Sequence, residues 1–311
     1  MPIIKPTEMN FSDKNIIMIV SGLPGTGKTT LALSAPDVLL IDTDEGMARV
    51  NPAHRKDASI CKTYEEVLSD IKAAEGTYKT IVIDTCGALI EYMKDWAMRT
   101  DPKASKKDGG FSLQGYGIVK AEFIRFSADL RKKFNVIYLF HEQMSRNGDD
   151  GVFYDLVADG SCKVICWQPA DLGAHLFIQN GRRYLGFTPT EQYSAKAAYG
   201  IKGLVEVPEL KDGEPNDFLT KLFTKVRDNL NAESKALAPE KKKYDAAIAE
   251  SKQACAAVNK PEDVAPAAQY IKALDHALTS EKEAIAMLKA RLAELGIVWN
   301  KTTKAYEYKT A

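Results

Sequence analysis

Residues 22–29 of the chain read Gly-Leu-Pro-Gly-Thr-Gly-Lys-Thr. They fit the pattern G-x-x-x-x-G-K-S/T, a glycine-rich loop whose backbone N–H groups cradle phosphate oxygens. The apolar stretch 17–20 before the loop predicts a buried strand, and residues 30–33 after it suit the first turns of a helix. This context favours phosphate binding, because a helix N-terminus adds its own positive field. The sequence therefore predicts a nucleotide-binding loop made by Gly22, Leu23, Pro24, Gly25, Thr26, Gly27, Lys28, Thr29 and Thr30.

One hydroxyl group and one carboxylate group are expected to hold a metal ion beside this loop. Lys28 can reach the β- and γ-phosphates of a nucleotide, and the Thr29 hydroxyl can ligate Mg²⁺. Asp84 follows the apolar run 81–83, which predicts a second buried strand ending at the same edge of the sheet. We therefore expect ATP and Mg²⁺ as cofactors, with Thr29 and Asp84 as metal ligands. The alternative for Asp84 is a cap for the segment that follows it.

Catalytic side chains are expected at the ends of two further strands. Asp42, Asp44 and Glu45 follow the apolar run 38–41, close to where an attacking water would lie. A surface turn rich in acids is the alternative interpretation. His141, with Glu142 and Gln143 after it, ends the apolar run 136–140 and can sense a γ-phosphate, although it can equally be structural. The predicted catalytic set is Lys28, Asp44, Glu45 and His141.

Hydrolysis of a nucleotide also needs positive charge to stabilise the transition state. Arg182, Arg183 and Lys196 are the candidates, and we expect the charge to come from a neighbouring subunit. They lie in or near residues 175–187, where Asn180-Gly181 predicts a hairpin with a type I′ turn.

The pattern of elements predicts an α/β fold with two domains. Strands that alternate with helices give a mainly parallel central sheet flanked by helices. We place this core at residues 1–230. Residues 231–311 are richer in Ala, Lys and Glu, and apolar residues repeat with 3/4 spacing from 271 to 295, which predicts a helical hairpin or short coiled coil followed by a short tail.

The amino-acid composition does not indicate a binding partner, but it does favour one cellular compartment. The 311 residues carry 42 basic and 42 acidic side chains, so net charge gives no indication of a nucleic-acid partner. No apolar run approaches the ~20 residues of a membrane span, and residues 1–6 lack a signal-peptide pattern. Five scattered cysteines suit a reducing cytoplasm. Cys162, Cys166 and His175 are a poor match to a zinc site.

Residues 100–117 predict a long loop that carries three lysines, Phe111 and Tyr116. Basic and aromatic side chains together suit a surface on which the bases of single-stranded DNA stack. The alternative is a solvated loop. Residues 144–160 predict a second loop, rich in Gly and Asp.

In combination, these motifs resemble the phage-type "AAA domain" nucleotide-binding proteins. The resemblance rests on Gly-x-Pro-Gly-x-Gly-Lys-Thr-Thr, Leu-Leu-Ile-Asp-Thr-Asp-Glu-Gly, Thr-Ile-Val-Ile-Asp-Thr, Gly-Tyr-Gly and a strand ending in His-Glu, within about residues 14–205. It implies a RecA-like core, a homo-oligomer, and ATP hydrolysis coupled to single-stranded DNA in phage recombination or annealing. Asp44 or Glu45 would take the place of the acidic residue after the second strand, and His141 that of the polar sensor. The resemblance does not explain residues 239–311.

Two other functions remain open at this point. A small-molecule or nucleoside kinase would need an arginine-rich lid over its acceptor, and the sequence has no such cluster. A nucleotide-gated scaffold would bind ATP with negligible turnover and recruit a partner through the C-terminal helices.

Overall fold

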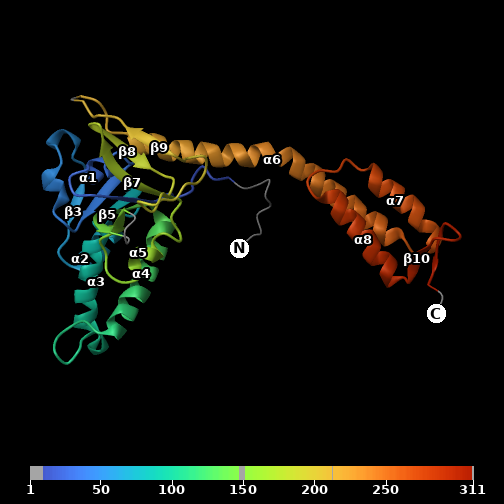
Figure 1. Ribbon diagram of the computed structural model, residues 1–311, viewed down its shortest axis with the longest axis horizontal. Helices are drawn as coiled ribbons and strands as arrows, with labels where there is room; N and C mark the ends of the chain where they lie inside the picture. The colour runs from blue at the N-terminus through green and yellow to red at the C-terminus, as the bar shows by residue number, and fades with distance from the viewer. Residues whose placement is uncertain (1–9, 147–150, 212, 310–311) are drawn as a thin grey trace. The chain divides into compact units, whose positions relative to one another are not determined.

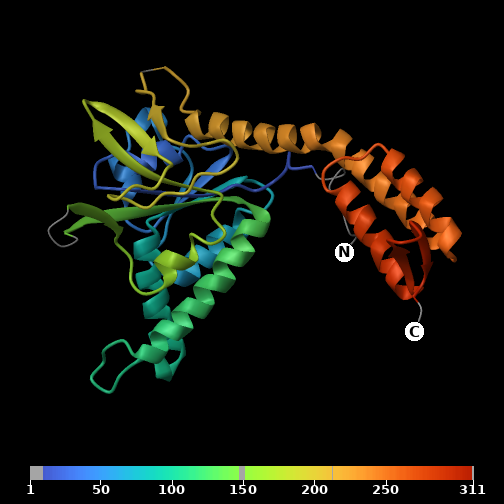
Figure 2. The same ribbon diagram turned by 45° about the vertical axis from the view of Figure 1, so that its right-hand side comes forward.

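A computed structural model describes residues 10–146, 151–211 and 213–309, without the side chains of residues 233 and 234. The chain divides into two compact units (Figures 1 and 2). The first comprises residues 13–229, and the second begins at Leu230 and includes residues 10–12. No helix within the described ranges is both long and apolar enough to cross a lipid bilayer.

The described strands of the first unit form a single sheet. They are β1 (Ile17–Gly22), β2 (Val38–Asp42), β3 (Ala58–Ile60), β4 (Thr80–Asp84), β5 (Asn135–Arg146), β6 (Val152–Leu156), β7 (Leu172–Gln179), β8 (Arg182–Gly186) and β9 (Leu204–Val207). Their order is β3-β2-β4-β5-β1-β7-β8-β9, and β6 pairs with β5. The run from β3 to β7 is parallel, whereas β6, β8 and β9 pair antiparallel with their neighbours.

Helices cover both faces of this sheet. They are α1 (Lys28–Ala32), α2 (Tyr64–Ala73), α3 (Cys86–Thr100), α4 (Leu113–Lys133), α5 (Cys162–Ile165) and α6 (Phe218–Ala257), with short 3₁₀ turns η2 (Gly46–Arg49), η3 (Pro52–His54) and η4 (Pro102–Ala104). Helices α2, α3 and α4 build the larger core with one face of the sheet. On the other face, α1 lies beside the start of α6, where the Leu219 amide donates to Ser34 Oγ. The predicted mainly parallel sheet flanked by helices is confirmed.

The central strands are buried along their whole length, as expected for a parallel sheet covered on both faces. Every residue of β1, β2 and β4 is buried. Their sequences, IMIVSG, VLLID and TIVID, are continuous apolar runs that end in polar residues. The polar ends therefore collect at the carboxyl edge of the sheet, where ligands bind in open α/β folds.

Two predicted loops are partly wrong. Helix α4 begins at Leu113 with a Ser112 cap, so residues 113–117 of the expected 100–117 loop are helical. The expected 144–160 loop contains the end of β5 and all of β6, which form an antiparallel pair. Both errors have one cause: glycines and charges at these positions signal loops locally, but tertiary packing keeps the backbone regular. Residues 147–150 lie outside the described ranges.

The second unit is helical, with a small β-hairpin. It holds α7 (Val264–Ala273), α8 (Ser280–Glu294), the 3₁₀ turn η5 (Pro261–Asp263), β10 (Ile297–Asn300) and β11 (Ala305–Tyr308). Its core joins residues of α6, α7, α8 and β10, among them Cys255, Val258, Val264, Ile271, Ala284, Leu288 and Ile297. The helical C-terminal region is confirmed, but its apolar stripe is not continuous. The chain leaves the helix at Leu274, and Leu278 is 57% exposed with a positive φ.

Candidate nucleotide-binding site

Sheet topology brings the predicted site residues to one edge. Strand β5 lies between β1, which carries the glycine-rich loop, and β4, which ends in Asp84. In register, Gly22 pairs with His141, and Asp42 pairs with Asp84. The carboxyl ends of β1, β2, β4 and β5 therefore present their polar residues side by side, although these residues are up to 119 positions apart in the sequence.

The glycine-rich loop has the conformation that its glycines allow. Gly25 and Gly27 have φ angles of 81° and 95°, a region that side-chain-bearing residues rarely adopt. At Gly22 the limit is space, since a Cβ there would lie 2.5 Å from the carbonyl oxygen of Leu176. Helix α1 starts at Lys28 directly after Gly27, which places Thr29 and Thr30 in its first turn. The loop and helix N-terminus thus present free backbone N–H groups, as phosphate binding requires.

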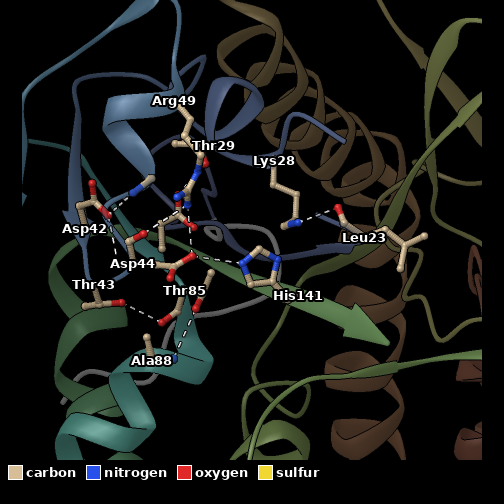
Figure 3. Close-up of polar contacts among 12 residues, drawn as sticks. Leu23, Lys28, Thr29, Asp42, Thr43, Asp44, Arg49, Thr85, Ala88 and His141 are labelled. Carbon is tan, nitrogen blue, oxygen red and sulfur yellow. Dashed lines mark hydrogen bonds and ion pairs between the residues drawn. The ribbon is translucent and has the colours of Figure 1, made fainter. Parts of the chain in front are cut away.

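Lys28 points back into the loop (Figure 3). Its Nζ donates to the carbonyl oxygens of Gly22 at 2.9 Å and Leu23 at 3.0 Å. Burial lowers the pKa of Lys28, and the negative charges of Asp84, Glu142 and Asp44 act in the opposite direction. A buried ammonium group next to the loop amides supplies positive charge where a phosphate chain would lie.

Thr29 and Asp84 meet across the predicted metal site. Thr29 Oγ1 donates to Asp84 Oδ2 at 2.6 Å. Burial raises the pKa of Asp84, and the Thr29 hydrogen bond partly offsets this. A Cβ at Gly46 would lie 2.9 Å from Asp84 Oδ2, so only glycine leaves this side of the carboxylate open. A hydroxyl and a carboxylate in contact fit Mg²⁺, which takes few protein ligands and completes its shell with water and phosphate oxygens.

The acidic residues after β2 have separate roles. Asp42 is buried, and its carboxylate accepts hydrogen bonds from the backbone N–H groups of Asp44, Gly46 and Met47, which fixes the turn. Asp44 lies half-exposed between Arg49 at 3.3 Å and His141 at 3.2 Å. Glu45 is exposed, and its side chain makes no hydrogen bond to another described residue. Asp44 is therefore the carboxylate of this group that contacts the rest of the site.

His141 lies on β5 and forms a further side of the site. Its Nε2 lies 3.2 Å from Asp44 Oδ2, and its Nδ1 is buried without a hydrogen-bond partner in the described part of the chain. In Figure 3, the side chains of Lys28, Asp44 and His141 surround one region at the edge of the sheet. The carboxylate of Asp44 favours the tautomer with the proton on Nε2, which leaves Nδ1 as an acceptor.

A buried acid–histidine pair lies next to the loop, and no motif in the sequence connects its two members. Glu142 and His175 are almost fully buried, with His175 Nδ1 2.8 Å from the carboxylate. The imidazole stacks on Tyr193 at 4.4 Å and also contacts Phe177 and Tyr154. The sequence signals were only that Glu142 follows the apolar run 136–140 and that His175 begins the predicted hairpin of residues 175–187. His175 is thus part of a buried aromatic and acidic cluster next to the loop.

The three candidate cations lie in different places. Arg183 contacts the loop of its own chain, where its Nε donates to the Thr26 carbonyl at 3.1 Å. Arg182 is exposed and pairs with Glu206. Lys196 donates to the carbonyls of Trp167 and Gln168.

Two cavities flank the loop within the first unit. The smaller, of about 230 Å³, is lined by residues that include Gly27, Thr30, Leu31, Leu176, Val207 and Asn216. The larger, of about 880 Å³, lies at the loop tip and has Leu23, Pro24, Tyr154, Phe177 and Tyr193 among its lining residues. One cavity therefore adjoins the helix side of the loop and the other adjoins its tip.

Comparison with known proteins gives one family. A family model described as "AAA domain" matches residues 14–199, which include the glycine-rich loop, Asp44, Asp84, His141 and Arg183. No curated protein matches the chain.

Proposed function

The chain belongs to the AAA domain family, and from that premise we propose that it binds ATP with Mg²⁺ and hydrolyses it. The observation that carries the proposal is the contact between Thr29 Oγ1 and Asp84 Oδ2 beside the buried Lys28 ammonium. A phosphate grip and a metal site are thereby adjacent, which is the arrangement that nucleotide hydrolysis needs.

Each site residue has a proposed part in this reaction. The loop amides and Lys28 bind the phosphate chain, and Thr29 with Asp84 holds Mg²⁺, which neutralises charge on the β- and γ-phosphates. Asp44, oriented by its contact with His141, is the proposed general base that positions the attacking water, and Glu45 is the neighbouring alternative. His141 is the proposed sensor of the γ-phosphate, because β5 places it between β1, which leads into the loop of Lys28, and β4, which ends in Asp84.

The nucleoside is proposed to occupy the smaller cavity. Lys28 and Asp84 mark the γ-phosphate end of the triphosphate, so the α-phosphate and the nucleoside are expected to lie towards Thr30. The cavity of about 230 Å³ begins there, and its apolar residues Leu31, Leu176 and Val207 suit the face of a base. Asn216 is fixed at its edge by a hydrogen bond to the Thr30 carbonyl at 2.8 Å.

We also propose that single-stranded DNA is the partner. Phe111 and Tyr116 do not support this, because they pack against each other at 5.0 Å and against Lys94. The larger cavity does support it, since the half-buried rings of Tyr154 and Phe177 line it beside the loop tip and aromatic rings stack on bases. A role in phage recombination or annealing and self-association belong to the same proposal and rest on the family resemblance. Cytoplasmic action is proposed from the five scattered cysteines.

ATP turnover of wild type and Lys28→Ala tests the proposed enzyme. We expect at least ~100-fold lower turnover in the variant, because the buried ammonium acts on the charge that develops on the phosphates. Lys79→Ala is the matched control, since Lys79 is an exposed lysine at the opposite edge of the sheet, paired with Asp37. ATP binding with negligible wild-type turnover would contradict the ATPase proposal and favour a nucleotide-gated scaffold.

The DNA proposal has its own test. Addition of single-stranded DNA should stimulate turnover more than duplex DNA does. Phe177→Ala should weaken binding of the single strand by about 5- to 150-fold, the range for loss of one stacked base. Tyr184→Ala is the control, because Tyr184 stacks on Phe177 at 5.8 Å without lining the cavity. Equal stimulation by duplex DNA, or none, would count against this partner while leaving the ATPase proposal intact.

A further inference from the structure

Arg183 touches the phosphate-binding loop although it lies 157 residues from Thr26 in the sequence. Its Nε donates to the carbonyl oxygen of Thr26 at 3.1 Å. The guanidinium also lies against Gly27, where a Cβ would be 3.1 Å from Nε and 3.7 Å from Cδ. The arginine therefore packs closely on the Thr26–Gly27 peptide itself, while the φ of 95° at Gly27 is what favours glycine there.

The backbone of Arg183 is held firmly. It lies in β8, the middle strand of an antiparallel group, where it pairs with Ile178 on β7 and with Val207 on β9. The turn that leads into β8 has positive φ angles at Asn180 and Gly181, 51° and 76°, as a tight type I′ turn requires. The position of the guanidinium thus depends on regular sheet pairing rather than on a long loop.

The contact with Thr26 determines which way the next amide points. A trans peptide is planar, so the carbonyl of Thr26 and the N–H of Gly27 point in opposite directions. With the carbonyl held on the arginine side, the Gly27 N–H faces the other side. This N–H has no hydrogen-bond partner in the described part of the chain. It precedes α1 directly, where a phosphate oxygen is expected to bind.

We propose that Arg183 is a positioning residue of the phosphate site, which fixes the Thr26–Gly27 peptide so that the Gly27 amide faces the ligand. The inference rests on the proposed nucleotide binding and adds the ligand feature that this amide recognises: the polyphosphate chain, independent of the base. Arg183 acts within its own chain. Its charge strengthens the effect, because a guanidinium beside a carbonyl polarises the peptide and makes its N–H a better donor.

The test compares two ligands on three variants. ATP and inorganic tripolyphosphate, each with Mg²⁺, are titrated calorimetrically into wild type, Arg183→Met and Arg182→Gln. Arg183→Met keeps an unbranched side chain but removes the donor and the charge. We expect up to about tenfold weaker binding of both ligands, the lower end of the range for one charge-assisted hydrogen bond, because the Arg183 side chain is exposed. Arg182→Gln is the control and should stay within twofold of wild type, since Arg182 pairs only with Glu206 on the surface.

A spectroscopic measurement separates positioning from a general loss of structure. The ¹⁵N–¹H resonance of Gly27 should move on tripolyphosphate binding in wild type, and this shift should shrink in Arg183→Met while the thermal midpoint stays within a few degrees. Weaker ATP binding with unchanged tripolyphosphate binding would overturn the inference, because Arg183 would then act on the nucleoside. Unchanged binding of both ligands would overturn it too. Failure of wild type to bind either ligand would instead contradict the proposed function itself.

Discussion

Replacing Gly46 by alanine introduces one methyl group into the proposed metal site. Its Cβ would lie 2.9 Å from Asp84 Oδ2 and 3.5 Å from Thr29 Oγ1. Ordinary van der Waals contact begins at 3.4 Å, so the carboxylate must retreat by the difference, about 0.5 Å. Gly46 is outside the left-handed region, so its backbone accepts alanine and the change acts through the contact alone.

A displacement of this size is expected to impair function more than folding. Catalytic groups must be held within about 0.5 Å of their productive positions, and a misplacement of 1 Å can cost ~100-fold in rate. We therefore expect about tenfold lower ATP turnover at limiting Mg²⁺ and a higher Mg²⁺ midpoint. Binding of ADP without metal should stay unchanged, because the methyl group meets Asp84 and Thr29 rather than the loop amides.

The assay is a Mg²⁺ titration of ATP turnover, with Gly117→Ala as the matched control. Gly117 lies within α4, and a Cβ there meets no atom within 4 Å. Alanine at this position should leave turnover unchanged and stabilise the fold by about 0.5–1 kcal/mol through helix propensity. The reasoning is refuted if Gly46→Ala has the Mg²⁺ midpoint and turnover of the control.

Three further changes have defined outcomes. His141→Asn should lower turnover by about 10- to 100-fold with little effect on ATP affinity, since it removes the partner of Asp44 and the proposed sensor; a fall in affinity alone would contradict that role. Asp84→Asn should abolish Mg²⁺-dependent turnover yet raise the thermal midpoint at neutral pH without metal. Burial raises the pKa of Asp84 in the folded protein, so ionisation of Asp84 lowers the free energy of unfolding as the pH rises through that pKa. The higher thermal midpoint of Asp84→Asn should therefore disappear as the pH falls towards ~3.9, the ordinary pKa of an aspartate. Melting curves across pH that show no such convergence would refute this. Pro239→Ala should stabilise the protein by up to about 3 kcal/mol, because an exposed proline inside α6 removes a backbone donor; chemical unfolding measures it, and a loss of stability would contradict it.

The parts of the fold that could be predicted from the sequence are those that short stretches of neighbouring residues determine. The loop of residues 22–29 and the apolar runs before Asp42, Asp84 and His141 carry their information within a few neighbouring residues. Parallel pairing then brings the strand ends together, so Thr29 and Asp84 were expected to meet although 55 residues separate them. The structure brings them into contact, while their metal-binding role and the domain boundary near residue 230 stay predictions.

The features that sequence reasoning missed depend on packing between distant segments. Arg183 was expected to reach a neighbouring subunit, and nothing in its local sequence places it 3.1 Å from Thr26. Glu142 and His175 form a pair because β5 and β7 flank β1, which is a property of strand order. Phe111 and Tyr116 looked available for stacking, but they pack on Lys94, whose side chain is only 10% exposed. Neither the order of strands in a sheet nor the burial of a lysine can be predicted from a few neighbouring residues.

A crystal structure with Mn²⁺ and a non-hydrolysable ATP analogue tests the central claim most directly, because manganese gives an anomalous signal that locates the metal. We predict the manganese peak at coordination distance from Thr29 Oγ1, with Asp84 bound to it directly or through one water, and the γ-phosphate beside Lys28 Nζ. A peak elsewhere, or a nucleotide whose phosphates do not meet the backbone amides of residues 25–29, would contradict the account.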